Sequence, residues 1–288
     1  MRSIQTIINR NHYWHLPLAY LCLAYIATFF IYSECTLHLL GLWTDWPTGE
    51  YSHGLLVLLV SMYLIWEQRK SIRREIPSTN YFALVILIFS HTMWFAATLV
   101  DVLLIQILSL LFTLAAISWA LLGTPVFRLI FYQFFLLIFA LPVWFPLQYP
   151  LQTLTTHAVH FLLSVADIPV YKSGYFLNLP NGTFEVAPGC SGLRYFLVAL
   201  YIGFLLAFIY YRSNAKKLIV LTISILLAIT ANILRVFSVV VFGYLTDMQH
   251  HLVHSHQNLG WFIFAIIITP LIYIASRYSD MQNRQDSA

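Results

Sequence analysis

A single cysteine stands where a turn gives way to an apolar run, in the segment Pro188-Gly189-Cys190-Ser191-Gly192-Leu193-Arg194. Proline and glycine favour a turn, so we expect Cys190 at or near the N-terminus of a helix. Free backbone N–H groups and the positive end of the helix dipole favour a thiolate there. Arg194, one helical turn deeper, would add positive potential or hold a carboxylate. The alternative is a buried cysteine that acts as a small apolar side chain.

A second polar pair, Asn232 and Arg235, lies inside the apolar run 218–242. Residues three apart share one face of a helix. Charged side chains at membrane depth are costly, and they usually face the protein interior or a water-filled cavity. The alternative is an arginine that extends to the membrane surface and pairs with a structural carboxylate.

Four histidines follow within seven residues, before the last apolar run. They are His250, His251, His254 and His256. Zinc needs a closed set of ligands, and no cysteine or pair of carboxylates accompanies these histidines, so we predict neither a metal nor a cofactor. His256 is favoured as a proton carrier because it lies nearest the next apolar run and precedes Gly260-Trp261. His254 is assigned a supporting position.

Together these three groups are the parts that acyl transfer needs. Cys190 would attack a peptide carbonyl and form a thioester. His256 would pair with the thiolate and later protonate the leaving amine. Arg235 would stabilise the negative charge that develops on the carbonyl oxygen.

The composition places this chemistry in a membrane. Of the 288 residues, 60% are hydrophobic and 9% are charged, and the mean hydropathy is +0.77. A soluble domain carries roughly a quarter charged residues. The net charge of +4 is small and spread along the chain, which argues against a nucleic-acid surface. Three cysteines without a short spacing predict no disulfide framework.

Eight apolar stretches predict an all-α polytopic membrane protein with about eight transmembrane helices, forming a single membrane domain over residues 1–288. We interpret the first stretch as a retained span and not a cleaved signal peptide, because no small-x-small site closes it. Asp101 would mark a tight turn between the third and fourth. The stretches are 15–33, 54–66, 81–99, 102–122, 126–147, 192–211, 218–242 and 258–276.

Basic residues set the expected orientation. If the N-terminus is cytoplasmic, twelve of the 15 lysines and arginines fall in inside segments and only Lys172 falls outside. Arg194 and Arg235 are the remaining two, within spans. Both termini are therefore predicted to be cytoplasmic, with a tail at 277–288, and the cysteine, arginine and histidine to share the extracytoplasmic side.

Residues 150–189 are predicted to form an extracytoplasmic insertion. Its first part has an apolar face typical of a helix that lies in the membrane interface. The second part alternates apolar and polar residues around Asn181-Gly182, a strong hairpin signal. A small β-hairpin would thus lead directly into Cys190.

These motifs resemble the exosortase/archaeosortase family of membrane transpeptidases. The resemblance rests on Cys190-Ser191-Gly192-Leu193-Arg194, on Asn232-Ile233-Leu234-Arg235-Val236, on His256 with Gly260-Trp261, and on Tyr51-Ser52-His53-Gly54 at the second stretch. It covers about residues 40 to 276, with the motifs in order. Each motif is short, but four in register on an eight-span scaffold are highly specific.

The resemblance implies a cysteine transpeptidase or protease in a bacterial inner membrane. Its substrates would be secreted proteins with a C-terminal signal made of a short motif such as Pro-Glu-Pro, a transmembrane helix and a basic tail. The product would be transferred to a surface glycolipid or polysaccharide. The family's catalytic residues correspond to Cys190, Arg235 and His256.

Two departures from the family pattern affect this assignment. Many members carry an acid shortly before the cysteine, where this chain has Pro188-Gly189, and the nearest acid is Glu185. The best-known bacterial subclass is often fused to a periplasmic domain, whereas this chain stops about 12 residues past its last stretch. We place Glu185, Ser191, Asn232 and Arg194 in substrate-binding or supporting positions. His53 is either a helix-capping or interface histidine, or a residue that forms a wall of the substrate groove or supports one that does.

Two other functions remain open on the residues alone. A transporter or lipid-binding module would use Arg194 and Arg235 as anion ligands and would not need Cys190. A membrane acyltransferase would use the histidine cluster and make His251 or His254 as important as His256.

Overall fold

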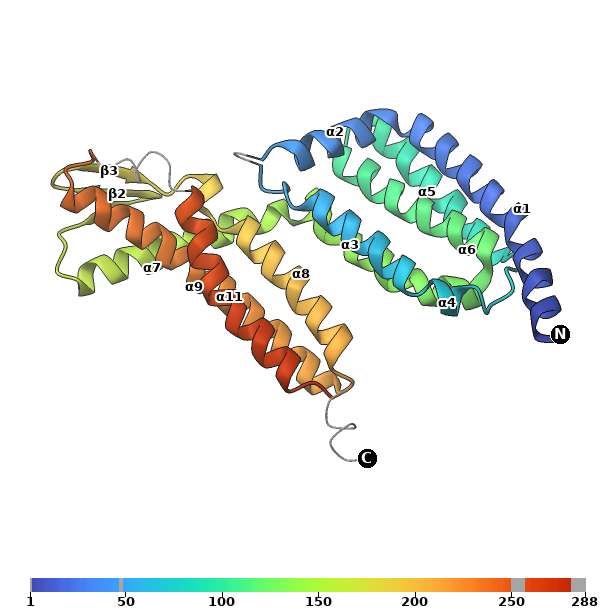
Figure 1. Cartoon of the computed structure of the whole chain (residues 1–288). Helices are drawn as coiled ribbons and strands as arrows, with labels where there is room; N and C mark the ends of the chain where they lie inside the picture. Colours follow the sequence, from blue (N-terminus) through green and yellow to red (C-terminus); the bar gives the residue numbers. More distant parts are fainter. Residues whose placement is uncertain (1, 47–48, 250–256, 281–288) are drawn as a thin grey trace. The chain divides into compact units, whose positions relative to one another are not determined.

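The computed structural model describes residues 2–46, 49–249 and 257–280, and the chain divides into two compact units, Met1–Val143 and Trp144–Ala288. Helices dominate both units, and the described strands form one small sheet in the second (Figure 1). The expectation of an all-α polytopic membrane protein is confirmed. That residues 1–288 act as one membrane domain stays a prediction.

Unit 1 consists of helices joined by short turns. In chain order they are α1 (Arg2–Ile31), α2 (Ser33–Thr44), α3 (Gly54–Glu67), α4 (Arg69–Ile72), α5 (Phe82–Leu99), α6 (Leu103–Leu136) and the 3₁₀ turn η1 (Leu137–Ala140). The turn η2 (Pro142–Leu147) follows. The predicted turn at Asp101 is present, with a φ of 53°. The short helix α2 is absent from the predicted elements, because its 12 residues are too few for a membrane span.

The element α6 is a helical hairpin, since the chain breaks at Gly123, whose φ of 81° and ψ of 168° are non-helical. Trp119 and Phe127 stack on either side of the break, with ring centroids 5.3 Å apart. Leu111 and Ile138 line one cavity, although a straight helix would separate them by about 40 Å. The two halves therefore run back along one another.

Six described helices are long and apolar enough to cross a membrane: Tyr13–Ile31, Phe82–Leu99, Leu103–Ala140, Pro188–Tyr210, Asn214–Leu245 and Asn258–Arg277. The third of these contains the α6 hairpin and so accounts for two predicted stretches, 102–122 and 126–147. The predicted stretch 54–66 is the shorter apolar helix Gly54–Glu67. Every predicted stretch is thus helical along most of its length.

Unit 2 contains a three-helix bundle. Its helical elements are α7 (Gln148–Val165), the 3₁₀ turn η3 (Pro188–Cys190), α8 (Leu193–Tyr210), α9 (Asn214–Leu245) and α11 (Gln257–Arg277). Helices α8, α9 and α11 lie side by side (Figure 1). Tyr195, Ala231 and Phe264 belong to their shared apolar core. Because each helix buries its apolar side chains in this core, the core fixes which face of each helix points inward.

The predicted hairpin is the greater part of a three-stranded antiparallel sheet, β1 (Tyr171–Ser173), β2 (Phe176–Leu179) and β3 (Gly182–Glu185). Leu179 pairs with Gly182, so the turn residues are Pro180 and Asn181, one position earlier than predicted. The Asn181 amide donates to the Tyr244 carbonyl oxygen and to the Asp247 carboxylate, at 2.7 and 2.8 Å. Through these hydrogen bonds, Asn181 holds the turn against the end of α9.

One apolar cluster joins the sheet to two helices. Its fully buried members include Val159 and Leu163 of α7, Leu177 of β2 and Val240 of α9. Cys190 packs against this cluster. The cluster therefore sets the place where the chain leaves the sheet and enters α8.

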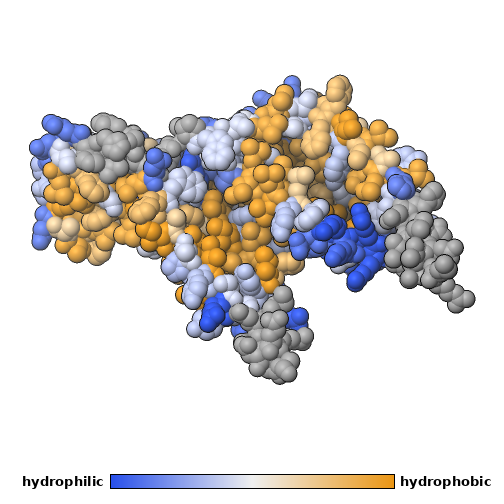
Figure 2. All heavy atoms as spheres, viewed as in Figure 1, coloured by the Kyte–Doolittle hydropathy of each residue, from blue (hydrophilic) through white to orange (hydrophobic). Residues whose placement is uncertain are grey.

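Large apolar side chains are exposed along the long helices, among them Phe30, Phe95, Ile223 and Tyr273. Apolar surface (orange in Figure 2) covers much of the helices, while hydrophilic residues gather at helix ends, for example over α4. Exposing this much apolar area to water would be unfavourable, whereas exposing it to lipid is not. The chain is a multi-pass membrane protein.

Candidate active site

Cys190 ends the short turn η3, three residues before α8 begins. Its N–H donates to the Ala187 carbonyl oxygen at 2.8 Å. Gly192 then takes a φ of 88°, which lets the chain turn into α8 without the steric cost that a Cβ would bring. Cys190 is half-buried. The predicted position near a helix N-terminus is thus correct, with Ser191 and the left-handed Gly192 between Cys190 and the helix.

Polar side chains of α7 and α9 hold this turn by its carbonyl oxygens. The Asn232 amide donates to the carbonyl oxygen of Cys190 and to the Thr155 hydroxyl, both at 3.0 Å. Gln152 donates to the carbonyl oxygen of Val186 at 2.7 Å. All three side chains are buried. Bonds of this kind in a low-dielectric interior fix backbone position, because breaking one would leave a buried polar group unpaired.

Arg235 is also buried, with 4% of its surface exposed. About 15 Å of helix axis separates it from the end of α9 at Leu245. Its guanidinium carbon lies 5.3 Å from the ring centroid of Tyr195, a cation–π geometry. Among the described residues, the Nε and Nη2 atoms have no hydrogen-bond partner. Two buried donors on a cation are costly unless a further acceptor reaches them.

Gly260 of α11 makes room for this arginine. A Cβ at that position would lie 2.1 Å from the Tyr195 hydroxyl and 2.5 Å from Cδ of Arg235. Only a residue without a side chain allows α11 to approach so closely. This contact explains Gly260 in the predicted motif with Trp261, whose ring packs edge-on against Tyr195.

Cys190 and Arg235 line one cavity of about 120 Å³, so the structure brings together two of the three predicted catalytic residues. Glu185 lines it as well and is exposed. Val236, Val239 and Val240 of α9 supply much of the remaining wall. The volume is below the range of about 300–1,000 Å³ that is typical of small-molecule sites, and it suits a carbonyl group and its neighbours.

The other residues assigned to this region take different positions. Ser191 is buried, and its hydroxyl accepts a hydrogen bond from the Leu193 N–H at 3.3 Å. Arg194 is half-buried and is not among the residues that line the cavity. The described cavity therefore gives no support to an anion site shared by Arg194 and Arg235.

His53 belongs to unit 1, where it precedes α3. It is buried, and its Nε2 lies 3.0 Å from the Phe139 carbonyl oxygen. Beside it, the Trp43 indole donates to the Ala140 carbonyl oxygen at 2.8 Å, and Gly54 packs directly on the Trp43 ring. These contacts favour a structural role for the motif around His53, anchoring the start of α3 to the turn η1. Its assignment to the substrate groove stays a prediction.

His254 and His256 lie outside the described residues, as do His250 and His251. The assigned roles of these histidines stay predictions. Within residues 2–46, 49–249 and 257–280, no three histidines, cysteines or carboxylates form a metal-sized group. No disulfide joins any two of Cys22, Cys35 and Cys190, all of which the structure describes.

Sequence reasoning missed Gln152 and Thr155. A signal was present, since the two polar residues lie three apart on the face of α7 that also carries the buried Val159. Without knowledge of what α7 packs against, that face could not be distinguished from a solvated one.

Comparisons with known proteins place the chain in a family. The chain is similar to the probable archaeosortase E of Methanocaldococcus jannaschii, with 28% identity over 148 residues, covering 51% of this chain and 75% of the relative. No solved structure matches the chain. The family model described as transmembrane exosortase matches residues 43–273, a range that holds Cys190, Arg235 and the buried motif around His53. The chain belongs to the transmembrane exosortase family.

Proposed function

We propose that this protein is a membrane cysteine transpeptidase with Cys190 as nucleophile, Arg235 as oxyanion ligand and His256 as proton carrier. One observation carries the proposal: the thiol of Cys190 and the buried arginine line the same small cavity. A buried guanidinium with two unpartnered donors among the described residues suits an oxygen atom on which negative charge develops.

The proposed reaction has two halves. The Cys190 thiolate attacks a peptide carbonyl carbon, and Arg235 binds the resulting oxyanion. The C–N bond then breaks, the leaving amine takes a proton from His256, and a thioester remains on Cys190. An acceptor amine or hydroxyl, or water, attacks the thioester, gives its proton to the histidine, and restores the thiolate.

Family membership favours membrane-anchored protein substrates. We propose that these carry a C-terminal signal of a short motif, a transmembrane helix and a basic tail, and that a surface glycolipid or polysaccharide is the acceptor. The distribution of basic residues supports an extracytoplasmic site in a bacterial inner membrane, with residues 150–189 on the same side. Glu185 is the acid in the cavity that would help to position the histidine.

The test is processing of a co-expressed protein that bears such a tail. Cys190→Ala should abolish the processed product, and mass spectrometry of the product from the wild-type enzyme should show the cleavage site and the attached group. A hydroxylamine-sensitive adduct between enzyme and substrate would report the thioester directly.

The matched control is Cys22→Ala. This changes an exposed thiol of α1 in the other unit and should leave processing at the wild-type level. Unchanged processing by the Cys190→Ala variant would exclude the cysteine mechanism.

A further inference from the structure

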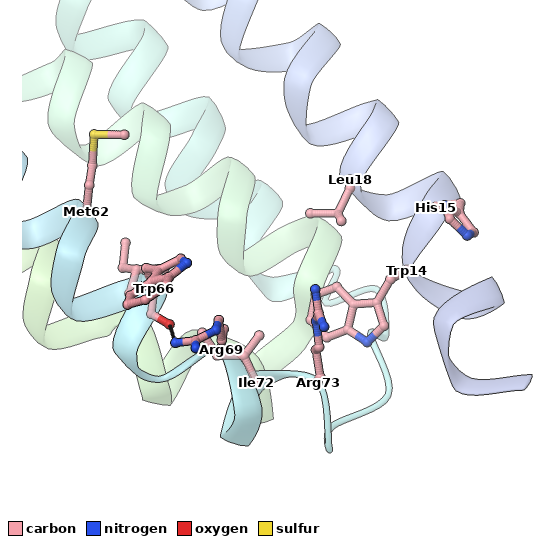
Figure 3. A pocket seen from close by; sticks show the side chains of 9 residues that line it. Trp14, His15, Leu18, Met62, Trp66, Arg69, Ile72 and Arg73 are labelled. Carbon is pink, nitrogen blue, oxygen red and sulfur yellow. Dashed lines mark hydrogen bonds between the residues drawn. The ribbon is translucent and has the colours of Figure 1, made fainter. Parts of the chain in front are cut away.

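Unit 1 holds a second, larger hollow, at the end of the unit that carries α4. Its volume is about 660 Å³, and residues of α1, α3 and α4 line it. Figure 3 shows Trp14 and Leu18 on α1, Met62 and Trp66 on α3, Arg69 on α4, and Arg73 just after α4. This hollow lies within one unit and contains none of the residues proposed for catalysis.

Most of the wall is apolar, formed by aliphatic, thioether and indole groups. Ile65 and Ile72 contribute to it together with Leu18 and Met62, and His15 of α1 also lines the hollow. Met62 and Trp66 are largely exposed on the surface that would face lipid. A hollow with this lining accommodates hydrocarbon, and tryptophans near its charged end are typical of the membrane interface.

Two arginines occupy the charged end of the hollow. Arg69 donates from Nη1 to the Trp66 carbonyl oxygen at 2.9 Å, and its guanidinium lies 3.8 Å from the Trp66 ring centroid (dashed line in Figure 3 for the hydrogen bond). This contact holds the guanidinium at the end of α3. Arg73 is exposed, one helical turn further on.

Nearby acids do not neutralise these arginines. Glu67 and Glu75 flank them in the sequence, but in the part of the chain that the structure describes neither forms an ion pair with Arg69 or Arg73. Lys70 and Arg74 add two more positive charges beside the hollow without lining it. The rim therefore has an excess of positive charge, and Figure 2 shows it as a hydrophilic patch next to apolar surface.

We propose that this hollow binds one anionic phospholipid. The phosphate would lie against Arg69 and Arg73, and an acyl chain would lie on Leu18, Met62 and Ile65. An arginine fork matches a phosphate group in geometry as well as charge, and basic pockets between membrane helices are suited to anionic headgroups. The adjacent apolar lining selects a lipid over a free anion.

Native mass spectrometry of the full-length protein in detergent tests this directly. Phosphatidylglycerol and phosphatidylcholine with identical acyl chains serve as probes. We expect one phosphatidylglycerol to remain bound per chain, with phosphatidylcholine retained much less. Arg69→Gln combined with Arg73→Gln should weaken phosphatidylglycerol binding roughly thirtyfold.

The matched control combines Lys70→Gln with Arg74→Gln, which removes the same charge beside the hollow but outside its lining. It should retain most of the binding. Equal loss in both double variants would show diffuse electrostatic attraction and overturn the site. Equal retention of the two lipids, or displacement by millimolar inorganic phosphate, would also overturn it.

A third variant separates a loss of lipid binding from a loss of folding. Met62→Trp adds bulk at the exposed apolar wall and leaves every charge in place, so it should reduce phosphatidylglycerol binding while thermal unfolding stays close to that of the wild type. Undiminished binding in this variant would contradict the placement of the acyl chain.

Discussion

The amide of Asn232 donates a hydrogen bond to the carbonyl oxygen of Cys190, with 3.0 Å between nitrogen and oxygen. Asn232 lies three residues before Arg235 on α9, so one helix positions both the cysteine turn and the buried guanidinium. A shift of α9 would move them together. This coupling makes the geometry of the cavity depend on a residue that need not touch the substrate.

We therefore expect Asn232→Ala to lower turnover more than it lowers substrate affinity. It removes the donor to both Cys190 and Thr155 in a buried site, which should cost about 1–3 kcal/mol of stability. Processing rates at several substrate levels, together with thermal unfolding, measure the two effects. Thr230→Ala, on an exposed part of the same helix, is the control. A turnover equal to that of the control would contradict the positioning role.

Arg235→Lys should reduce turnover by about 10²–10³-fold. The positive charge remains, but the planar fork that can reach an oxyanion with two donors is lost. Single-turnover thioester formation is the appropriate measurement, because it isolates the step in which the oxyanion develops. Near-normal thioester formation would remove the assigned role of Arg235.

Gly192 and Gly174 provide a matched pair for the turn beside Cys190. Both have positive φ, 88° and 60°, so alanine at either site should cost about 1–2 kcal/mol from backbone strain. A Cβ at Gly192 would also lie 2.5 Å from Cγ of Asn232, whereas nothing lies within 4 Å of one at Gly174. Thermal unfolding and processing should therefore be impaired much more by Gly192→Ala. Equal losses of stability and processing in the two variants would mean that the Asn232 side chain can move aside at little cost.

Gly260 and Gly41 provide the same comparison for the support of Arg235. Gly260→Ala would press on Tyr195 and on Cδ of Arg235, so we expect a clear loss of turnover. Gly41 in α2 has open space around its Cβ position, so Gly41→Ala should leave turnover unchanged and stabilise the helix by up to about 1 kcal/mol. Processing assays on both variants decide whether the approach of α11 matters for the site. Wild-type turnover in Gly260→Ala would show that it does not.

Asp280, after α11, should make stability depend on pH in the acid range. The hydrogen bond from Lys216, with a second one from the Arg212 N–H, holds the pKa of this carboxyl below its ordinary value of 3.8. Its stabilising contribution is therefore present above about pH 4 and is lost as the pH falls through the lowered pKa. The contribution should be small, because the pair is solvated.

Thermal unfolding of the wild type and of Asp280→Asn between pH 3 and 7 measures this contribution. The gap between the two proteins should narrow as the pH falls. Asp167→Asn serves as control, since Asp167 forms no ion pair among the described residues. A gap that stays constant across the range would contradict the assignment.

The sequence by itself determined that this is a membrane protein, where its helical stretches lie, and which side chains could take part in catalysis. Hydropathy and helical length are local properties, and lipid imposes them strongly on every segment. The same holds for Asn181-Gly182, where turn chemistry predicted a hairpin, although the docking of Asn181 on α9 moved the turn by one residue.

Only the tertiary structure decided which residues meet. Cys190 and Arg235 are 45 positions apart, and their shared cavity depends on the packing of α7, the sheet and α9 around one apolar cluster. Periodicity could not show that Gln152 and Thr155 face the cysteine turn, or that Arg194 stays outside the cavity. It also could not separate the structural contacts of His53 from a role in the substrate groove. Such outcomes depend on contacts between segments distant in sequence, which local pattern does not encode.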